Sequence, residues 1–180
     1  MNEDSDERVW YHCTCHTYAA WLYGDSRGYR TRHHREHVEG DYKNPPAPGQ
    51  YDSQLKRSLG LLKQPPVRIQ QDYREIVGFG MVAKLRQYTA QVLALSVSSN
   101  HVHILAKMRM NEIPRLWVGY AKREAIFRLK AIGWQGKLWA KRSGINPIED
   151  RAHQLSTFHY ILRHQNEGAW TWDFQEHPDT

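Results

Sequence analysis

Cysteine is scarce in this 180-residue sequence, and long apolar runs are missing from it. The two cysteines, Cys13 and Cys15, lie too close along one predicted strand for an easy disulfide. No apolar run approaches the length of a membrane span, and the acidic residues near the start do not match the basic start of a signal peptide. We therefore expect neither a disulfide-stapled secreted protein nor a membrane protein, but a protein of the reducing cytoplasm.

Acidic residues are scarce between Lys107 and Arg142. This stretch holds ten lysines and arginines but only two acids, whereas the whole chain has a net charge of +6. Aromatic residues are interleaved with these cations: Trp117, Tyr120, Phe127, Trp134 and Trp139. Cations bind phosphates and aromatic rings stack on unpaired bases, so the mixture is typical of proteins that bind single-stranded nucleic acid. The alternative is a basic amphipathic helix, and we expect Trp117 and Phe127 in the core and the cations exposed.

Hydrophobic patterning predicts the order β-α-β-β-α-β-α within one domain. The first six elements match the ferredoxin-like pattern, an α+β fold with an antiparallel sheet, and the last helix is extra. The predicted strands are 9–22, 90–97, 101–108 and 136–141, and the predicted helices are 69–88, 112–132 and 151–167. Residues 1–8 and 171–180 are expected to be loose and 24–64 to form a long loop region, all within a single domain of residues 1–180.

The sequence Asn100-His101-Val102-His103-Ile104-Leu105 carries two histidines two positions apart. Alternate residues of a strand share a face, so His101 and His103 point one way while Val102 and Ile104 enter the core. Two imidazoles on one strand face can bind a divalent metal ion. The spacing alone favours the alternative, two surface histidines on an exposed sheet face.

The last predicted helix carries a polar stripe. His153, Thr157, Tyr160 and His164 are spaced by four, three and four residues, which places them on one helix face, with Asp150 as the N-cap. A tyrosine beside a metal ion can attack a phosphodiester and form a covalent phosphotyrosine. The alternative is a solvated helix face with a half-buried tyrosine. Tyr88 and Tyr120 are weaker nucleophile candidates because no histidine accompanies them on their helices.

Several cations are predicted to contact the phosphate backbone. They come from the long loop and from the basic stretch: Arg27, Arg30, Arg32, Lys107, Arg109, Lys122, Arg123, Lys141 and Arg142. A separate cluster contains His12, Cys13, Cys15 and His16, but its spacing does not match common zinc sites. Strand alternation puts the two cysteines on one face and the two histidines on the other, so we expect buried cysteines rather than a metal site.

Three segments, in this order, resemble the single-tyrosine HUH transposases, and in particular the REP-associated tyrosine transposases. The first is Thr17–Gly28 (TYAAWLYGDSRG), the second is the His-Val-His triplet at 101–103, and the third is Tyr160-Ile161-Leu162-Arg163-His164-Gln165. The resemblance runs from Tyr11 to Gln165. It implies a ferredoxin-like, nucleoid-associated prokaryotic nuclease that cuts and rejoins single-stranded DNA next to hairpins.

Carried over residue by residue, the resemblance implies that His101 and His103 bind Mg²⁺ or Mn²⁺ and that Tyr160 forms the 5′-phosphotyrosine link. Many relatives place a glutamine ligand four residues after the tyrosine, whereas this chain has His164 there and Gln165 next. Helix geometry favours His164 as the third ligand, and histidine ligands favour Mn²⁺ over Mg²⁺.

Two other functions are compatible with the same residues. A domesticated protein could bind hairpin DNA without cutting it, and a sequence-specific RNA-binding module could use the same sheet topology. Such RNA-binding modules place aromatic residues on the central strands, where this chain has His101 and His103. The protein could act as a monomer or as a homodimer that exchanges its tyrosine helix.

Overall fold

The computed structural model describes residues 8–29, 37–41, 43–109 and 113–176. The chain forms two compact units: Met1–Tyr18 with Arg68–Thr180 make the larger one, and Ala19–Val67 make the smaller one. The expected single domain over residues 1–180 stays a prediction. Among the described residues, no helix combines the length and the apolar character needed to cross a bilayer.

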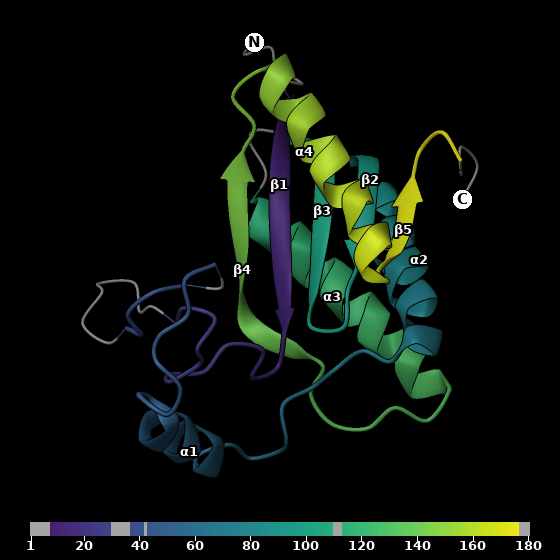
Figure 1. The fold of residues 1–180 in the computed structure, drawn as a ribbon. Helices are drawn as coiled ribbons and strands as arrows, with labels where there is room; N and C mark the ends of the chain where they lie inside the picture. Colours follow the sequence, from purple (N-terminus) through teal and green to yellow (C-terminus); the bar gives the residue numbers. More distant parts are fainter. Residues whose placement is uncertain (1–7, 30–36, 42, 110–112, 177–180) are drawn as a thin grey trace. The chain divides into compact units, whose positions relative to one another are not determined.

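The larger unit is built on a five-stranded antiparallel sheet (Figure 1). Its strands are β1 (Arg8–Thr17), β2 (Gln91–Val97), β3 (His101–Arg109), β4 (Trp139–Pro147) and β5 (Trp170–Asp173). The order across the sheet is β4-β1-β3-β2-β5, so the first four strands have the ferredoxin-like arrangement and β5 extends it. The predicted α+β fold is therefore confirmed, and β3 is its central strand.

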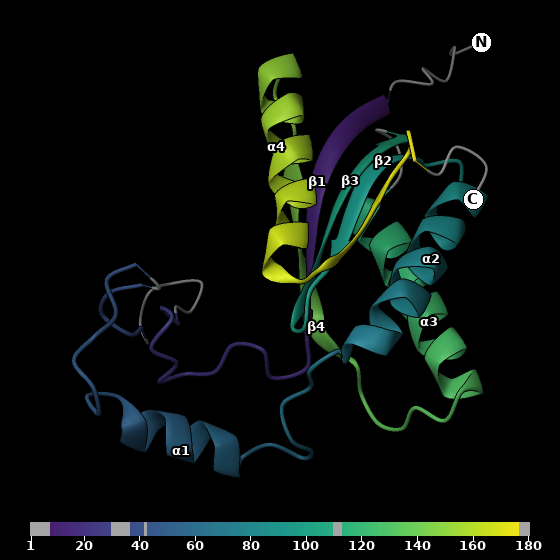
Figure 2. The ribbon, with the colours of Figure 1, turned by 45° about the vertical axis from the view of Figure 1, so that its right-hand side comes forward.

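Helices cover both faces of the sheet (Figure 2). On one face α2 (Gln71–Gln87) and α3 (Pro114–Ala131) pack against each other and against the strands. The core between them is apolar and fully buried: Val77, Met81, Leu85, Val118, Ala125, Leu129, Val102, Ile104 and Ala106. On the other face lies α4 (Arg151–Arg163), which contacts β2, β3 and β5.

A small apolar cluster fixes α4 to the sheet. Ile161 of α4 is fully buried against Ala94 and Leu105, and Phe158 and Leu162 pack on the same cluster. The expected N-cap is present, because the Asp150 side chain accepts a hydrogen bond from the backbone N–H of His153 at 2.7 Å. The α-helix ends at Arg163 and tightens into a 3-10 turn, η1 (His164–Glu167), inside the range predicted as helix.

Some predicted boundaries and burials are wrong. The first strand ends at Thr17 rather than Leu22, and the fourth runs to Pro147 through residues expected to form a loop, because β1 pairs with it as far as Pro147. Strand β5 occupies part of the expected loose end, where Trp172 is fully buried. Phe127, expected in the core, is 71% exposed, because it lies on the outer side of α3.

The smaller unit contains one helix within the predicted long loop region, α1 (Asp52–Gly60), which buries none of its residues. The Ser58 hydroxyl donates to the Tyr23 carbonyl at 2.9 Å and links this helix to the start of the unit. Residues 1–7 and 177–180, which the sequence predicts to be loose, lie outside the described residues.

Gly78 of α2 makes a close approach to β5 that allows no side chain. A Cβ atom there would overlap the six-membered ring of Trp170, which also packs edge-on against Phe79 with ring centroids 5.0 Å apart. We expect Gly78→Ala to lower the free energy of unfolding by about 1–3 kcal/mol, because overpacking outweighs the gain in helix propensity.

Gly119 of α3 is the matched control for this substitution. A Cβ atom at Gly119 would meet nothing within 4 Å, so Gly119→Ala should stabilise the protein by up to about 1 kcal/mol. Urea unfolding of both variants measures the two effects. A Gly78→Ala protein as stable as the Gly119→Ala protein would contradict the packing of Trp170 against α2.

Candidate metal and nucleophile site

The two faces of β3 have different chemistry. Val102 and Ile104 point into the core under α2 and α3, as predicted, and both are fully buried. His101 and His103 lie on the opposite face, beneath α4, where His103 is only 7% exposed. The sheet therefore presents two imidazoles to the helix that carries the predicted tyrosine.

Helix α4 brings Tyr160 and His164 over these histidines. The ring of His103 lies 5.2 Å from that of Tyr160 and 4.9 Å from that of His164, between ring centroids. The Tyr160 hydroxyl is 3.5 Å from Nε2 of His103. Tyr160 itself is 38% exposed, so its hydroxyl borders both the histidines and the solvent.

Three histidines come close enough to hold one metal ion. His101, His103 and His164 each offer a ring nitrogen, and these nitrogens lie within 4.8 Å of one another. His164 is 7% exposed, whereas its neighbour Gln165 is exposed. The geometry thus places His164, rather than Gln165, with the other two histidines.

Hydrogen bonds to Nδ1 orient each of these rings. His164 donates from Nδ1 to the Tyr160 carbonyl at 2.9 Å, and His101 donates from Nδ1 to the Asn100 side-chain oxygen at 2.8 Å. Nδ1 of His103 lies 3.0 Å from Nε2 of His12 and 3.2 Å from the Thr14 hydroxyl. A proton on Nδ1 leaves Nε2 with a free lone pair, which is the form in which a histidine binds a metal ion.

His12, Thr14 and His16 were missed as members of this site. In the register of β1 and β3, Thr14 pairs with His103 and His16 pairs with His101, so these side chains share the α4 face. Strand alternation correctly predicted that the two histidines lie on the face opposite Cys13 and Cys15, and both cysteines are buried as expected. The missing signal was the strand order: a ferredoxin-like sheet puts β1 beside β3.

Burial and neighbouring imidazoles favour the neutral forms of His103 and His12. Burial, followed by the nearby rings of His101, His12, His164 and His16, lowers the pKa of His103 to about 2. Burial also lowers the pKa of His12, with smaller contributions from His153 and His164. Imidazole ligands suit Co²⁺ or Zn²⁺ best, and they suit Mn²⁺ better than Mg²⁺, which prefers oxygen ligands. The three histidines therefore fit a divalent metal ion.

The polar stripe of α4 is only partly directed at the site. Thr157 is buried, and Nδ1 of His153 accepts a hydrogen bond from the Glu149 backbone at 3.4 Å, in the turn before the helix. Leu155 of the same helix is 46% exposed. His153 is separate from the three histidines that could share one ion.

Lys122, one of the predicted nucleic-acid contacts, is buried between α3 and β4. Its side chain is only 8% exposed, and its ammonium group donates to the Ala140 carbonyl at 2.8 Å and lies 3.4 Å from the Ser143 hydroxyl. Burial lowers its pKa. Lys122 therefore ties α3 to β4 instead of reaching the solvent, because the inner side of α3 faces that strand.

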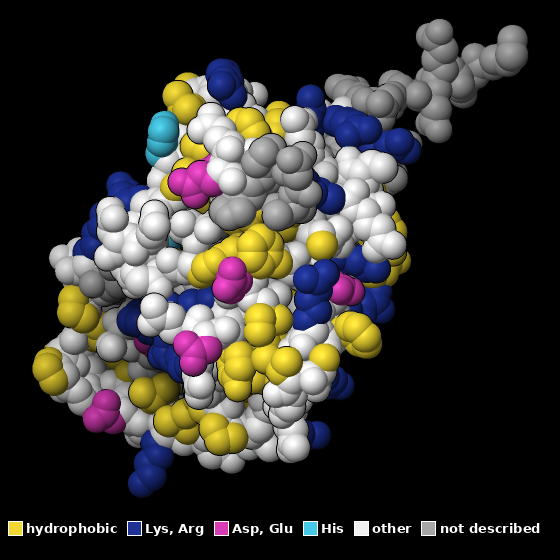
Figure 3. Space-filling view, turned by 90° about the vertical axis from the view of Figure 1, so that its right-hand side faces the viewer, with side chains coloured by type: hydrophobic (Ala, Val, Ile, Leu, Met, Phe, Trp, Pro, Cys, Tyr) yellow, Lys and Arg dark blue, Asp and Glu magenta, His cyan; other side chains and the backbone are white. Residues whose placement is uncertain are grey.

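The basic stretch does not form one surface around the histidines. Helix α3, with Arg123 exposed on it, lies on the opposite side of the sheet from α4. Seen from the side of α2 and β5, lysine and arginine side chains are scattered among hydrophobic ones (Figure 3). The exposed cations of residues 107–142 therefore lie on both sides of the sheet. Lys107 does lie on the α4 side, 5.8 Å from the Trp10 ring, and Lys141 and Arg142 are exposed on β4.

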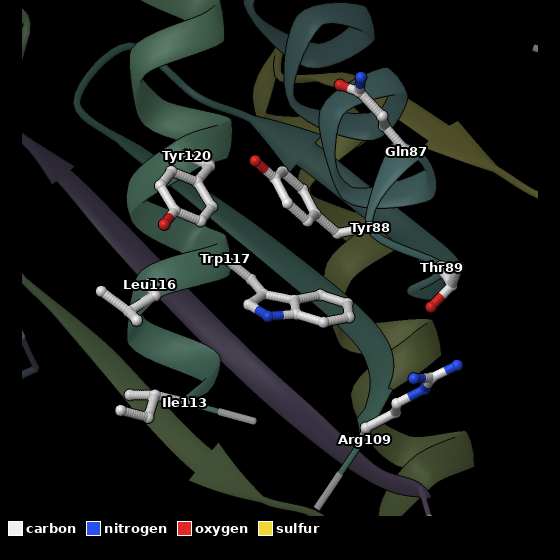
Figure 4. Close-up of a pocket in the computed structure, with 8 residues that line it drawn as sticks. All are labelled: Gln87, Tyr88, Thr89, Arg109, Ile113, Leu116, Trp117 and Tyr120. Atoms are coloured by element: carbon white, nitrogen blue, oxygen red, sulfur yellow. The ribbon is translucent and has the colours of Figure 1, made fainter. Parts of the chain in front are cut away.

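Two aromatic residues of this stretch, Trp117 and Tyr120, line a hollow at one end of α2 and α3 together with Tyr88 (Figure 4). Tyr88 and Tyr120 stack there with ring centroids 4.9 Å apart, and the buried Trp117 lies beside Tyr88, while Arg109 lines the rim. Arg123 covers the Tyr120 ring at 4.6 Å. Both tyrosines are thus remote from the three histidines, on the other side of the sheet.

The predicted contacts of the long loop belong to the smaller unit. Arg27 is paired with Asp25, at 2.8 Å from Nε to Oδ1, and also donates to the Ala20 carbonyl. These bonds order the loop and engage its guanidinium group. Arg30 and Arg32 lie outside the described residues.

Comparisons with known proteins give structural neighbours only. No family model matches the chain, and no curated protein matches it. One similar structure is that of a REP-associated tyrosine transposase bound to a REP hairpin, with 13% identity and a TM-score of 0.48 over 93% of this chain and 75% of that one. Another is a candidate transposase from Deinococcus radiodurans R1, with 14% identity and a TM-score of 0.42 over 92% of this chain and 96% of that one.

Proposed function

We propose that this chain is a transposase-like HUH nuclease that cuts and rejoins single-stranded DNA next to hairpins, in the cytoplasm. The observation that carries the proposal is the position of the Tyr160 hydroxyl, 3.5 Å from His103 and beside a cluster of three histidines. A nucleophile within reach of a metal site and open to solvent suits attack on a large polymer substrate.

Tyr160 supplies the nucleophile in this proposal. The Tyr160 oxygen attacks the phosphorus atom of the scissile phosphodiester and gives up its proton to water or to a neighbouring base. The bond from phosphorus to the 3′ oxygen breaks, and that oxygen leaves as a 3′-hydroxyl after taking a proton. The product is a 5′-phosphotyrosine, which a 3′-hydroxyl can later attack to rejoin a strand.

His101, His103 and His164 would hold a divalent ion through their Nε2 atoms. Such an ion supplies charge that polarises the phosphate and favours the phenolate form of a tyrosine, whose ordinary pKa is about 10. Contacts at Nδ1 keep the three rings in position. The Asn100 side chain accepts from His101, and the Tyr160 carbonyl accepts from His164. His12 and Thr14 contact Nδ1 of His103.

A labelled-strand assay tests the proposed function. The full chain is mixed with single-stranded hairpin DNA labelled at either end, in Mn²⁺, Mg²⁺ or EDTA, and run on a denaturing gel. We expect the 3′ label to shift into a covalent protein band and the 5′ label to appear on a shorter free strand, with Mn²⁺ at least as effective as Mg²⁺ and no reaction in EDTA.

Two other results would replace the proposal. Tight hairpin binding with both labels on intact DNA, under every metal ion, would favour a domesticated DNA-binding protein that does not cut. Displacement of the DNA by single-stranded RNA at equal concentration would favour an RNA-binding module instead.

A further inference from the structure

A groove lies beside Tyr160 on α4, and the roles proposed for Tyr160 and the three histidines do not use it. It has a volume of about 540 Å³, and residues of that one helix line it: His153, Ser156, Thr157, His159, Tyr160 and Arg163. Their side chains are imidazoles, hydroxyls and one guanidinium group, and no carboxylate lines the groove. A groove of this composition attracts an anion with several oxygen atoms rather than an apolar segment.

Arg163 is the only permanent charge in this lining. It is exposed, its guanidinium group lies 5.8 Å from the centre of the Tyr160 ring, and no carboxylate of the described residues pairs with it. Arg27 and Arg128, by contrast, are paired with Asp25 and Glu124. The charge of Arg163 is therefore available to a ligand.

Tyr160 lies between the two anion-attracting features of this face. The histidine cluster contacts one side of its ring, through His103 and His164, and Arg163 lies over the ring from the next turn of the helix. A strand whose phosphate reaches the Tyr160 hydroxyl needs a path for its neighbouring phosphates. The groove provides that path along α4, past Ser156 and His159, both of which are exposed.

We propose that this groove binds the phosphodiester backbone of the single-stranded substrate next to the bond that Tyr160 attacks, with Arg163 as its principal phosphate contact. The inference rests on the proposed function and adds a site for the substrate strand. A guanidinium group binds a phosphate through two parallel N–H donors and retains its charge at any ordinary pH.

The salt dependence of binding tests the groove without any cleavage. A 5′-fluorescein single-stranded hairpin oligonucleotide is titrated with the full chain in EDTA, by fluorescence anisotropy, at several salt concentrations. Arg163→Gln should weaken binding about 3- to 10-fold and reduce the slope of log K against log salt by about 0.7, the value for one lost contact to a single strand. Arg163→Lys should keep the slope, because the lysine retains the positive charge. This variant separates the effect of the charge from the effect of guanidinium packing on the Tyr160 ring.

Arg151→Gln is the matched control, since Arg151 is exposed on the first turn of the same helix, donates to Gln154 and does not line the groove. Its affinity and slope should equal those of the unmodified chain, and melting temperatures should show that all variants fold. An unchanged slope in Arg163→Gln, or an equal loss in Arg151→Gln, would overturn the inference.

The two proposals fail in different ways. Binding that depends on Arg163 without any covalent adduct in Mn²⁺ would overturn the nuclease and retain the groove. An adduct formed by a chain whose binding ignores Arg163 would retain the nuclease and overturn the groove. A chain that binds no oligonucleotide at all would overturn both.

Discussion

Tyr160→Phe should abolish the covalent adduct and lower strand cleavage by about 10³-fold or more, because it removes the attacking oxygen. The phenyl ring can keep its contacts with His103 and His164. Since Tyr160 is 38% exposed and its hydroxyl is the only group lost, the variant should fold and bind DNA like the unmodified protein. Denaturing gels measure the adduct, and anisotropy in EDTA measures the retained binding.

Tyr120→Phe provides the control for this experiment. Tyr120 stacks on Tyr88 in the hollow at the end of α2 and α3, on the other side of the sheet. Its substitution should leave the adduct unchanged. An adduct that persists in Tyr160→Phe would show that another residue attacks the phosphate and would end the assignment of Tyr160.

His164→Ala should weaken binding of Mn²⁺ or Co²⁺ by about 100-fold or more, since the loss of outer-shell partners alone commonly costs 10- to 100-fold. His164 is buried, and its ring nitrogen lies within 4.8 Å of those of His101 and His103. Titration calorimetry gives the affinity, and the visible absorption of bound Co²⁺ reports the coordination geometry of the ion.

Gln165→Ala separates the two candidates for the third ligand. Gln165 is exposed in η1, one position after His164, so its loss should change metal affinity by less than about 3-fold, as expected for a surface substitution. His164→Gln should lie between the two, because an amide oxygen is a weaker ligand for these ions than imidazole. A larger loss from Gln165→Ala than from His164→Ala would reverse the assignment.

The parts of the site that the sequence predicted are those set by local periodicity. Alternation along a strand placed His101 and His103 on one face, and the spacing of a helix placed Tyr160 and His164 together. Both rules act within a single element, so they require no knowledge of the fold. The ferredoxin-like order of elements then put the helix after the sheet, where it could cover β3.

The features that the sequence did not predict depend on tertiary contacts. His12 joins the site through the pairing of β1 with β3, over 91 residues along the chain. Lys122 is buried because β4 offers it a carbonyl, although its neighbours in the sequence resemble a solvated basic helix. Strand β5 is four residues long and depends on its pairing with β2. No pattern within these four residues predicts that pairing.

The arrangement of ligands over two elements has a consequence for motion. His101 and His103 belong to β3, whereas His164 lies at the end of α4, which otherwise rests on the sheet through a small apolar cluster. An ion held by all three would cross-link the helix and the sheet. Ion binding would stabilise the arrangement in which α4 rests on the sheet by RT ln(1 + [ion]/Kd). The helix that carries Tyr160 would then be held most firmly when the metal ion is bound. Metal binding and the alignment of Tyr160 would therefore be thermodynamically coupled.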